Sequence, residues 1–308
     1  MKILLFGKGG QVGWELQRSL APLGELITLD FDSTDYCGDF TNLTGLVETV
    51  RAIKPDFIVN AGAHTAVDKA QGEPELARTI NALAPDALAK ASAESGAWLV
   101  HYSTDYVFDG SGTRAWLETD MPAPVNVYGR TKLEGEELIQ ASGCKHLIFR
   151  TSWVYGARGG NFAKTMLKLA QEREVLKVIN DQIGAPTGAE LLADISAHAI
   201  RQAGFGLAGA KPAAPVPSGT YHLVAEGEVS WYDYACHVVA FAKNTPLAPK
   251  IVASRIEPVP TSAFPTAAQR PLNSRLNTAK IQAALGVRLP NWKQGVERML
   301  VEYIEKQT

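Results

Sequence analysis

Short runs of consecutive apolar residues alternate with longer helix-like stretches through the first half of the chain. The apolar runs lie at residues 2–6, 25–30, 55–60, 98–103 and 146–150. A strand buried on both faces reads as such a continuous run, and helical patterns fill the segments between. The pattern therefore predicts an α/β fold, a doubly wound parallel sheet whose ligands bind at the carboxyl ends of the strands.

The alternation loosens after about residue 150. We expect helices at 161–172, 189–203, 231–242 and 292–304, a strand at 175–179, and loops at 181–187 and 270–276. Residues 204–218 are rich in Gly, Ala and Pro, which favours a surface connection. Residues 1–150 should form a nucleotide-binding domain. Residues 151–308 should form mainly a smaller, mixed substrate-binding lobe, interleaved with the first domain and returning later pieces to it.

Composition and charge narrow the class of protein. A chain of 308 residues with 46% apolar and 20% charged residues is typical of a globular protein. The net charge of -2 provides no basic surface for nucleic acid or an anionic membrane. Cys37, Cys144 and Cys236 form no C-x-x-C pair, so neither a disulfide framework nor structural zinc is indicated. The apolar start is too short for a signal peptide, and no run reaches the length of a membrane span. We therefore expect a cytoplasmic protein.

Glycines follow the first apolar run directly and open the first helical pattern. Gly7, Gly10 and Gly13 give the spacing G-x-x-G-x-x-G. Glycine lets the backbone turn sharply and approach a pyrophosphate, and the free N–H groups at a helix start attract the anion. Alone, such a turn fits a nucleotide loop and a simple tight turn equally well. Its place after the first strand favours the nucleotide loop.

Asp30 ends the second apolar run, where an acidic residue can bind the adenosine ribose. Its charge would repel a 2′-phosphate and favour NADH, whereas Lys8 can attract that phosphate, so NADH and NADPH both stay open. The alternative is a strand-end turn aspartate. Farther along, Asp39 and Phe40 can flank adenine, and His64 is expected to be a loop or contact residue rather than a catalytic base.

A tyrosine and a lysine four residues apart begin a predicted helix. Proline precedes Tyr128 and Lys132, which places both in its first turns. Four helical residues span about 400° of rotation and about 6 Å of rise, so both side chains share one face. The ammonium should lower the pKa of the Tyr128 phenol from about 10 towards neutrality. The commoner meaning of so short a pattern is a surface tyrosine beside a solvated lysine, and only a surrounding site excludes it.

Several motifs follow one another in a recognisable order. The glycine loop, Asn60-Ala61-Gly62-Ala63, Ser103-Thr104-Asp105 and Tyr128-x-x-x-Lys132 make the chain resemble the extended short-chain dehydrogenase/reductases, which have a Rossmann fold. More narrowly, the chain is similar to the family of dTDP-4-dehydrorhamnose reductases. That similarity is carried by residues 63–70, 103–110, 127–132, 150–156, 181–187 and 270–274.

The resemblance implies a reaction and a set of contacts. Hydride would pass from NADPH or NADH to the C4 ketone of a dTDP-sugar, giving dTDP-L-rhamnose for surface polysaccharide such as O-antigen. The ketone oxygen gains negative charge and needs a proton donor, which Tyr128 can be. Lys132 would hold the nicotinamide ribose, and Thr104 would donate a hydrogen bond to the ketone oxygen.

The resemblance also implies which residues contact the cofactor and the substrate. The implied cofactor contacts are Gly7, Gly10, Gln11, Val12, Gly13, Asp30, Asp39, Phe40, Ala63, His64, Thr65, Tyr102, Tyr128 and Lys132. The implied substrate contacts are Thr104, Asp105, Trp153 and Arg270. Arg275 is a second candidate for the substrate diphosphate.

Other activities of the superfamily stay open. Related dehydratases resemble a Thr-Asp-Glu pattern, but Tyr106 follows Thr104-Asp105 here, which disfavours elimination. Epimerases are harder to separate by residues alone. A non-enzymatic regulatory subunit of the methionine adenosyltransferase type would fit better without Tyr128 or Lys132. Some relatives are linked to Mg2+ and to a homodimer, but Glu15 and Glu190 show no ligand spacing that specifies a metal.

Overall fold

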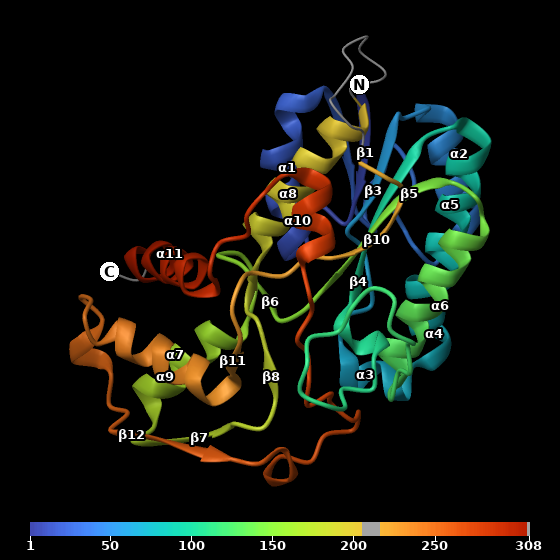
Figure 1. Ribbon diagram of the computed structural model, residues 1–308. Helices are drawn as coiled ribbons and strands as arrows, with labels where there is room; N and C mark the ends of the chain where they lie inside the picture. Colours follow the sequence, from blue (N-terminus) through green and yellow to red (C-terminus); the bar gives the residue numbers. More distant parts are fainter. Residues whose placement is uncertain (205–215, 307–308) are drawn as a thin grey trace.

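A six-stranded parallel sheet forms the centre of the computed structural model, which describes residues 1–204 and 216–306 (Figure 1). Its strands are β1 (Lys2–Phe6), β2 (Glu25–Leu29), β3 (Phe57–Asn60), β4 (Trp98–Thr104), β5 (Lys145–Thr151) and β10 (Gly219–His222). The spatial order is β10-β5-β4-β3-β1-β2, with every pairing parallel. The order reverses beside β1, and such a reversal opens a crevice at the carboxyl ends of the strands.

Helices cover both faces of the sheet (Figure 1). One face carries α2 (Leu43–Ile53), α5 (Ala84–Ser95) and α6 (Val127–Ala141), and the other carries α1 (Gln11–Leu20), α8 (Ala189–Gly204) and α10 (Ala279–Leu285). Neighbouring residues of β1 serve the two cores alternately: Leu4 packs with α2 and α5, whereas Ile3 and Leu5 pack with α1 and α8. The continuous apolar run of β1 is thus explained by burial on both faces.

The predicted doubly wound sheet is confirmed, and its first five strands lie within a residue or two of their expected positions. Strand β10, which pairs with β5, was not predicted because Gly219–His222 is short and forms no apolar run. Residues 74–95 form three consecutive helical segments, α4 (Pro74–Arg78), the π-helical η2 (Thr79–Leu83) and α5. Pro85 lacks a backbone N–H, and the chain takes its wider π turn just before it. A further helix, α3 (Val67–Gly72), was not predicted.

The second half builds a smaller layer beside the sheet. Helices α7 (Phe162–Glu172), α9 (Trp231–Ala242) and α11 (Trp292–Glu305) share one core with β7 (Val175–Ile179), which pairs in parallel with β12 (Arg255–Val259). The remaining short strands are β6 (Val154–Tyr155), β8 (Ile183–Gly184), β9 (Thr187–Gly188) and β11 (Val229–Ser230). The short 3-10 turns are η1 (Ala21–Leu23), η3 (Asp105–Val107), η5 (Ala248–Lys250) and η6 (Thr261–Ala263).

The expected helices and the strand of this half are confirmed, whereas β12 and α10 were not predicted. Strand β10 and helices α8 and α10 return from the second half to the central sheet. The division of the chain at residue 150 stays a prediction. Most of the predicted connection at 204–218 lies outside the described residues. Within the described part of the chain, no helix is long and apolar enough to cross a membrane.

Candidate active site

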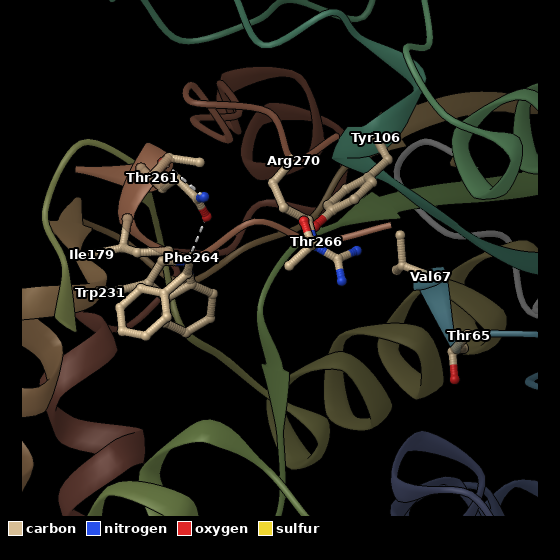
Figure 2. A pocket seen from close by; sticks show the side chains of 10 residues that line it. Thr65, Val67, Tyr106, Ile179, Trp231, Thr261, Phe264, Thr266 and Arg270 are labelled. Atoms are coloured by element: carbon tan, nitrogen blue, oxygen red, sulfur yellow. Dashed lines mark hydrogen bonds between the residues drawn. The ribbon is translucent and has the colours of Figure 1, made fainter. Parts of the chain in front are cut away.

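A cavity of about 490 Å³ lies where the carboxyl ends of the strands meet the second half of the chain. Its wall includes Gly10, Gln11, Val12, Ala63, Thr65, Tyr102, Thr104, Asp105, Tyr106, Tyr128, Lys132, Trp153 and Trp231. A second cavity of about 410 Å³ shares Thr65, Val67, Tyr106 and Trp231 with it and adds Phe264 and Arg270 (Figure 2). The structure thus brings most of the expected cofactor and substrate residues into one continuous cleft.

The glycine loop forms one end of this cleft. Gly7 has φ +80°, and a Cβ on Gly13 would lie 1.9 Å from the carbonyl oxygen of Gly7, so only glycine fits this turn. Gly7 and Gly13 set the conformation of the loop without lining the cavity, whereas Gly10 and Gln11 line it. Gly10 caps α1 with no side-chain hydrogen bond, and the buried Oε1 of Gln11 has no hydrogen-bond partner. Uncapped N–H groups at this helix start are suited to an anion.

Asp30 is tied to the glycine loop. Its Oδ2 accepts from Gly9 N at 2.8 Å, and its Oδ1 accepts from Phe31 N at 3.0 Å. Asp39 likewise accepts from the N–H and hydroxyl of Thr41, both at 2.8 Å. The expectation that the Phe40 ring flanks adenine is wrong in this structure. That ring is buried in the core, edge-on to the Phe6 ring with centroids 5.8 Å apart. A cofactor could therefore contact Phe40 only through its backbone.

The cofactor contact expected of His64 stays a prediction. Its ring does not line the cavity, and its Nε2 lies 3.4 Å from Glu73 Oε2. Its backbone is held instead by Asn81, whose Oδ1 accepts from His64 N at 2.8 Å and whose Nδ2 donates to His64 O at 3.1 Å. Asn81 also donates to Thr131 on α6. Sequence reasoning missed this brace, although a fully buried amide in the π turn is the type of residue that needs such partners.

Tyr128 and Lys132 occupy the first turns of α6, as predicted. Asn126 caps the start of the helix, and its side chain accepts from Gly129 N at 2.8 Å. Lys132 is buried and donates to Tyr102 O at 2.6 Å. The pKa of Lys132 is lowered to about 8 because burial disfavours the ammonium, while the Glu136 carboxylate acts in the opposite direction.

The expected lowering of the Tyr128 pKa by Lys132 is wrong in this structure. Burial raises the pKa of Tyr128 to about 12, and the charge of Asp105 adds to the rise. A hydrogen bond with the Thr104 side chain acts against it. The reason is geometric: the Lys132 ammonium points to the β4 backbone rather than to the phenol. Near pH 7 the Tyr128 phenol therefore keeps its proton and can donate it.

Thr104 and Asp105 end β4 beside Tyr128. Thr104 Oγ1 donates to Asp105 Oδ1 at 3.1 Å and accepts from Tyr106 N at 3.2 Å. Burial raises the pKa of Asp105 to about 7, although hydrogen bonds from Ser274 and Thr104 act in the opposite direction. The buried Oδ2 of Asp105 has no hydrogen-bond partner. Tyr106 stands edge-on to Tyr128 with ring centroids 5.5 Å apart, at the position where a dehydratase pattern has glutamate.

Two stacked indoles form the opposite wall. Trp153, in the left-handed conformation at φ 49°, stacks on Trp231 with centroids 3.6 Å apart and planes 13° apart. Trp231 Nε1 donates to Gln182 Oε1 at 3.1 Å, and Gln182 in turn donates to Thr261 (Figure 2). The sequence predicted a role for Trp153 but missed Trp231, because the two residues lie in different elements and no local spacing links them.

Arg270 closes the second cavity. Its Nη2 lies 2.6 Å from Asp68 Oδ2, whereas its buried Nη1 has no partner. Arg275 faces elsewhere and pairs with Glu228 at 2.6 Å, so the cleft contains only the first of the two predicted cations.

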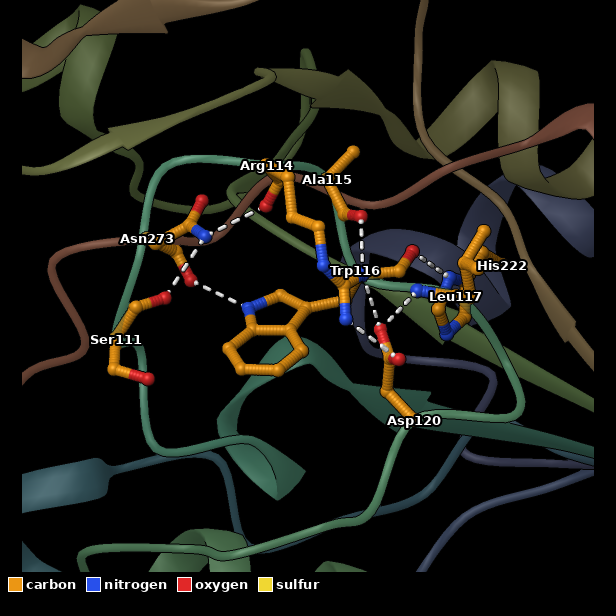
Figure 3. Close-up of polar contacts among 8 residues, drawn as sticks. All are labelled: Ser111, Arg114, Ala115, Trp116, Leu117, Asp120, His222 and Asn273. Atoms are coloured by element: carbon orange, nitrogen blue, oxygen red, sulfur yellow. Dashed lines mark hydrogen bonds and ion pairs between the residues drawn. The ribbon is translucent and has the colours of Figure 1, made fainter.

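Asn273 holds the Arg270 loop in place. Its side chain donates to Ser111 O at 3.2 Å and to Arg114 O at 2.8 Å, and its own carbonyl accepts from Trp116 Nε1 at 3.2 Å (Figure 3). The adjoining Ser274 bonds Asp105. The Arg-Pro-x-Asn-Ser motif is therefore a clamp between two loops as well as a source of one cation.

Glu15 and Glu190 lie outside this cleft. Glu190 lines another cavity of about 210 Å³ with Asp194 and Arg298, and its pKa is raised by burial and by the charge of Glu15. Among residues 1–204 and 216–306, no three His, Cys, Asp or Glu side chains are grouped to hold a metal ion. The Mg2+ expectation stays a prediction.

Comparisons with known proteins show the family and the fold. The sequence model of a family described as RmlD substrate binding domain matches residues 1–305. The dTDP-4-dehydrorhamnose reductase of Escherichia coli K12 is 61% identical over 98% of this chain and 98% of its own. The crystal structure of dTDP-4-dehydrorhamnose reductase from Bacillus anthracis in complex with NADP is 34% identical, with TM-score 0.85, and covers 98% of this chain and all of its own. UDP-glucose 4-epimerase from Thermus thermophilus, solved with NAD, is 18% identical with TM-score 0.77 over 99% of both chains, which shows the fold alone.

Proposed function

We propose that this chain, which belongs to the RmlD substrate binding domain family, reduces the C4 ketone of dTDP-4-dehydro-L-rhamnose to dTDP-L-rhamnose with NADPH or NADH. The observation that carries the proposal is the meeting of Tyr128 and Thr104 in one cavity with the glycine loop. A neutral phenol, a hydroxyl and an anion-binding helix start are the groups that ketone reduction by a dinucleotide requires. The full-length relatives with this reductase name support the same assignment.

The glycine loop fits a dinucleotide. The uncapped start of α1 and the unpartnered Gln11 Oε1 both border the cavity. We assign the pyrophosphate to residues 10–12, the adenosine ribose to Asp30, and the nicotinamide side to Ala63, Thr65, Tyr102 and Lys132. The bound cofactor supplies the hydride.

Tyr128 and Thr104 deal with the charge that develops on the ketone oxygen. Tyr128 gives its proton to that oxygen, because the phenol is neutral at working pH and borders the cavity. Thr104 donates to the same oxygen and loses its present bond to Asp105 Oδ1 in doing so. Lys132 lies one turn along the helix, and we assign its ammonium to the nicotinamide ribose, because it points to the β4 backbone rather than to the phenol.

The two-indole wall and Arg270 suit the rest of the substrate. Trp153 and Trp231 present flat apolar surface to a sugar ring, and Asp105 Oδ2 is a free acceptor for a sugar hydroxyl. Arg270 Nη1 has a free donor in the adjoining cavity, where a diphosphate can receive it. A buried donor without a partner is costly, so a ligand that satisfies it gains affinity.

The alternatives receive less support. Tyr106 cannot replace the acid that elimination needs, and its ring packs edge-on to Tyr128. The epimerase likeness at 18% identity supports only the fold. A regulatory role would leave the assembled Tyr128, Thr104 and Lys132 unexplained. A cytoplasmic location, a homodimer, Mg2+ and a role in O-antigen synthesis stay predictions.

A coupled assay tests the function directly. Purified protein is supplied with dTDP-glucose, the upstream dehydratase and epimerase, and NADPH or NADH, and the absorbance of the reduced nicotinamide is followed. We expect one nicotinamide oxidised per dTDP-sugar converted, and none when the epimerase is omitted. No oxidation with either cofactor in the complete mixture would overturn the proposal.

A further inference from the structure

His101 is a fully buried histidine in the middle of β4 for which the proposed reaction has no use. It lies on the same face of the strand as Leu99, towards α5 and α6. Its two ring nitrogens both face nitrogen atoms. Nε2 is 3.1 Å from Lys132 Nζ, and Nδ1 is 3.0 Å from Asn60 Nδ2.

Asn60 determines which ring nitrogen carries the proton. Asn60 Oδ1 accepts from Gly62 N at 3.0 Å, so the amide oxygen is committed to that loop and the NH2 group faces His101. A flipped amide would set its NH2 against the Gly62 N–H, two donors facing each other. The ring Nδ1 must therefore be the acceptor. In neutral His101 the proton is then on Nε2 and points at Lys132.

That proton distinguishes the two forms of the lysine. An ammonium has three donors and no lone pair, so it opposes an N–H at 3.1 Å, whereas a neutral amine can accept it. Tyr102 O accepts from Nζ at 2.6 Å in either form. We propose that His101 is a positioning residue, which Asn60 holds with its proton on Nε2. This proton favours the neutral amine form of Lys132 over the ammonium, so that both charge states of the lysine are populated. The proposal rests on the proposed function, since the charge of Lys132 matters to the reaction only if Lys132 holds the nicotinamide ribose.

The carboxylate nearest to His101 and Lys132 already has hydrogen-bond partners of its own. Glu136, one turn along α6, receives a bidentate pair from Arg150 on β5 and a hydrogen bond from Ser103 on β4. Tyr128 on the same helix and Asp105 in η3 are titratable groups on the cavity wall that Lys132 also lines. The pKa of His101 is lowered well below its usual value by burial and then by the Lys132 charge, so the ring stays neutral. The titrating member of the pair is the lysine.

A pH profile tests the proposal in the holoenzyme. In the proposed function the Lys132 ammonium donates to the nicotinamide ribose, so kcat/KM for NADPH should fall as pH rises through the pKa of Lys132, which burial lowers to about 8. In His101→Gln the side-chain carbonyl can accept from the ammonium. We expect the alkaline limb to move up by about one pH unit, the worth of one hydrogen bond. His222→Gln is the matched control: His222 is a buried histidine of β10 that contacts Trp116 O. An identical limb in the wild type and in both variants would overturn the proposal.

Two-bond 1H–15N spectra of histidine-labelled protein test the tautomer without turnover. The wild type should show His101 neutral with its proton on Nε2. In Asn60→Asp the carboxylate can accept from both Gly62 N and ring Nδ1, so the proton should move to Nδ1 and the alkaline limb should rise as in His101→Gln. The double variant should rise no further. A wild-type proton on Nδ1, or an added rise in the double variant, would overturn the proposal. Failure of the proposed function shows differently, as no nicotinamide oxidation by the wild type at any pH.

Discussion

The two walls of the cleft are built in opposite ways. One wall, which we call the catalytic wall because the proposed function assigns its chemistry to Thr104, Tyr128 and Lys132, comes from one central strand and one helix that packs on it. The indole wall (Trp153, Trp231 and Arg270) comes from a residue with positive φ, a helix start and a loop in separate parts of the chain. In the proposed function, the chemistry that needs fixed distances thus lies on regular, deeply buried elements, and substrate recognition lies on segments outside them.

The largest difference between the walls should appear in turnover. Tyr128→Phe removes the proton donor and should lower kcat by about 10²- to 10⁴-fold. Its ring still packs against Tyr106, so NADPH binding measured by fluorescence quenching should change little. Turnover within a few-fold of the wild type would exclude Tyr128 as the acid.

The support of the catalytic wall should dominate stability. Glu136→Ala leaves the buried Arg150 guanidinium unpaired and should lower the free energy of unfolding by about 3–5 kcal/mol in urea titrations. Glu134→Ala on the same helix removes the exposed partner of Arg78 and should change it little. Equal losses for the two variants would mean that the buried pair has no special role.

The indole wall should affect substrate binding rather than chemistry. Trp231→Ala removes the ring stacked on Trp153 and should raise KM for the dTDP-sugar by about tenfold, with kcat and the NADPH KM nearly unchanged. Trp231→Phe keeps a ring and should recover most of the loss. A fall in kcat with an unchanged KM would move Trp231 to the catalytic side of the comparison.

The smallest effect is expected at the cofactor end. Asp30→Asn removes the charge but keeps an acceptor for Gly9 N, so the glycine loop should stay in place. We expect the ratio of kcat/KM for NADPH to that for NADH to rise about fivefold. Asp30→Ala, which also loses the bond to Gly9, separates loop order from charge. An unchanged ratio in Asp30→Asn would contradict a ribose contact for Asp30.

The chemistry of the catalytic wall was open to prediction because it is local. Tyr128 and Lys132 are related by helical spacing alone, and Thr104 follows a strand that its apolar run identifies. The same local reasoning failed on the pKa of Tyr128. Where the Lys132 ammonium points depends on β4, which the spacing along α6 does not describe.

The indole wall shows what such reasoning does not reach. Trp231 meets Trp153 only because β8 pairs with β11, and Gly184 in β8 leaves room for the Trp153 ring. Phe40, a cofactor candidate by its position, is buried because its side chain faces the core beneath Gly62. Neither outcome can be derived from residues nearby in the sequence.

The sequence by itself determined the first five strands of the sheet, the glycine turn and the placement of Tyr128 and Lys132 in the first turns of one helix, because hydrophobic period, backbone freedom and helical spacing act over a few residues. Only the tertiary structure decided the charge states and the partners: Lys132 against His101, Arg270 against Asp68, and Trp153 against Trp231. Burial and contact between distant segments set those properties, and both exist only once the chain has folded.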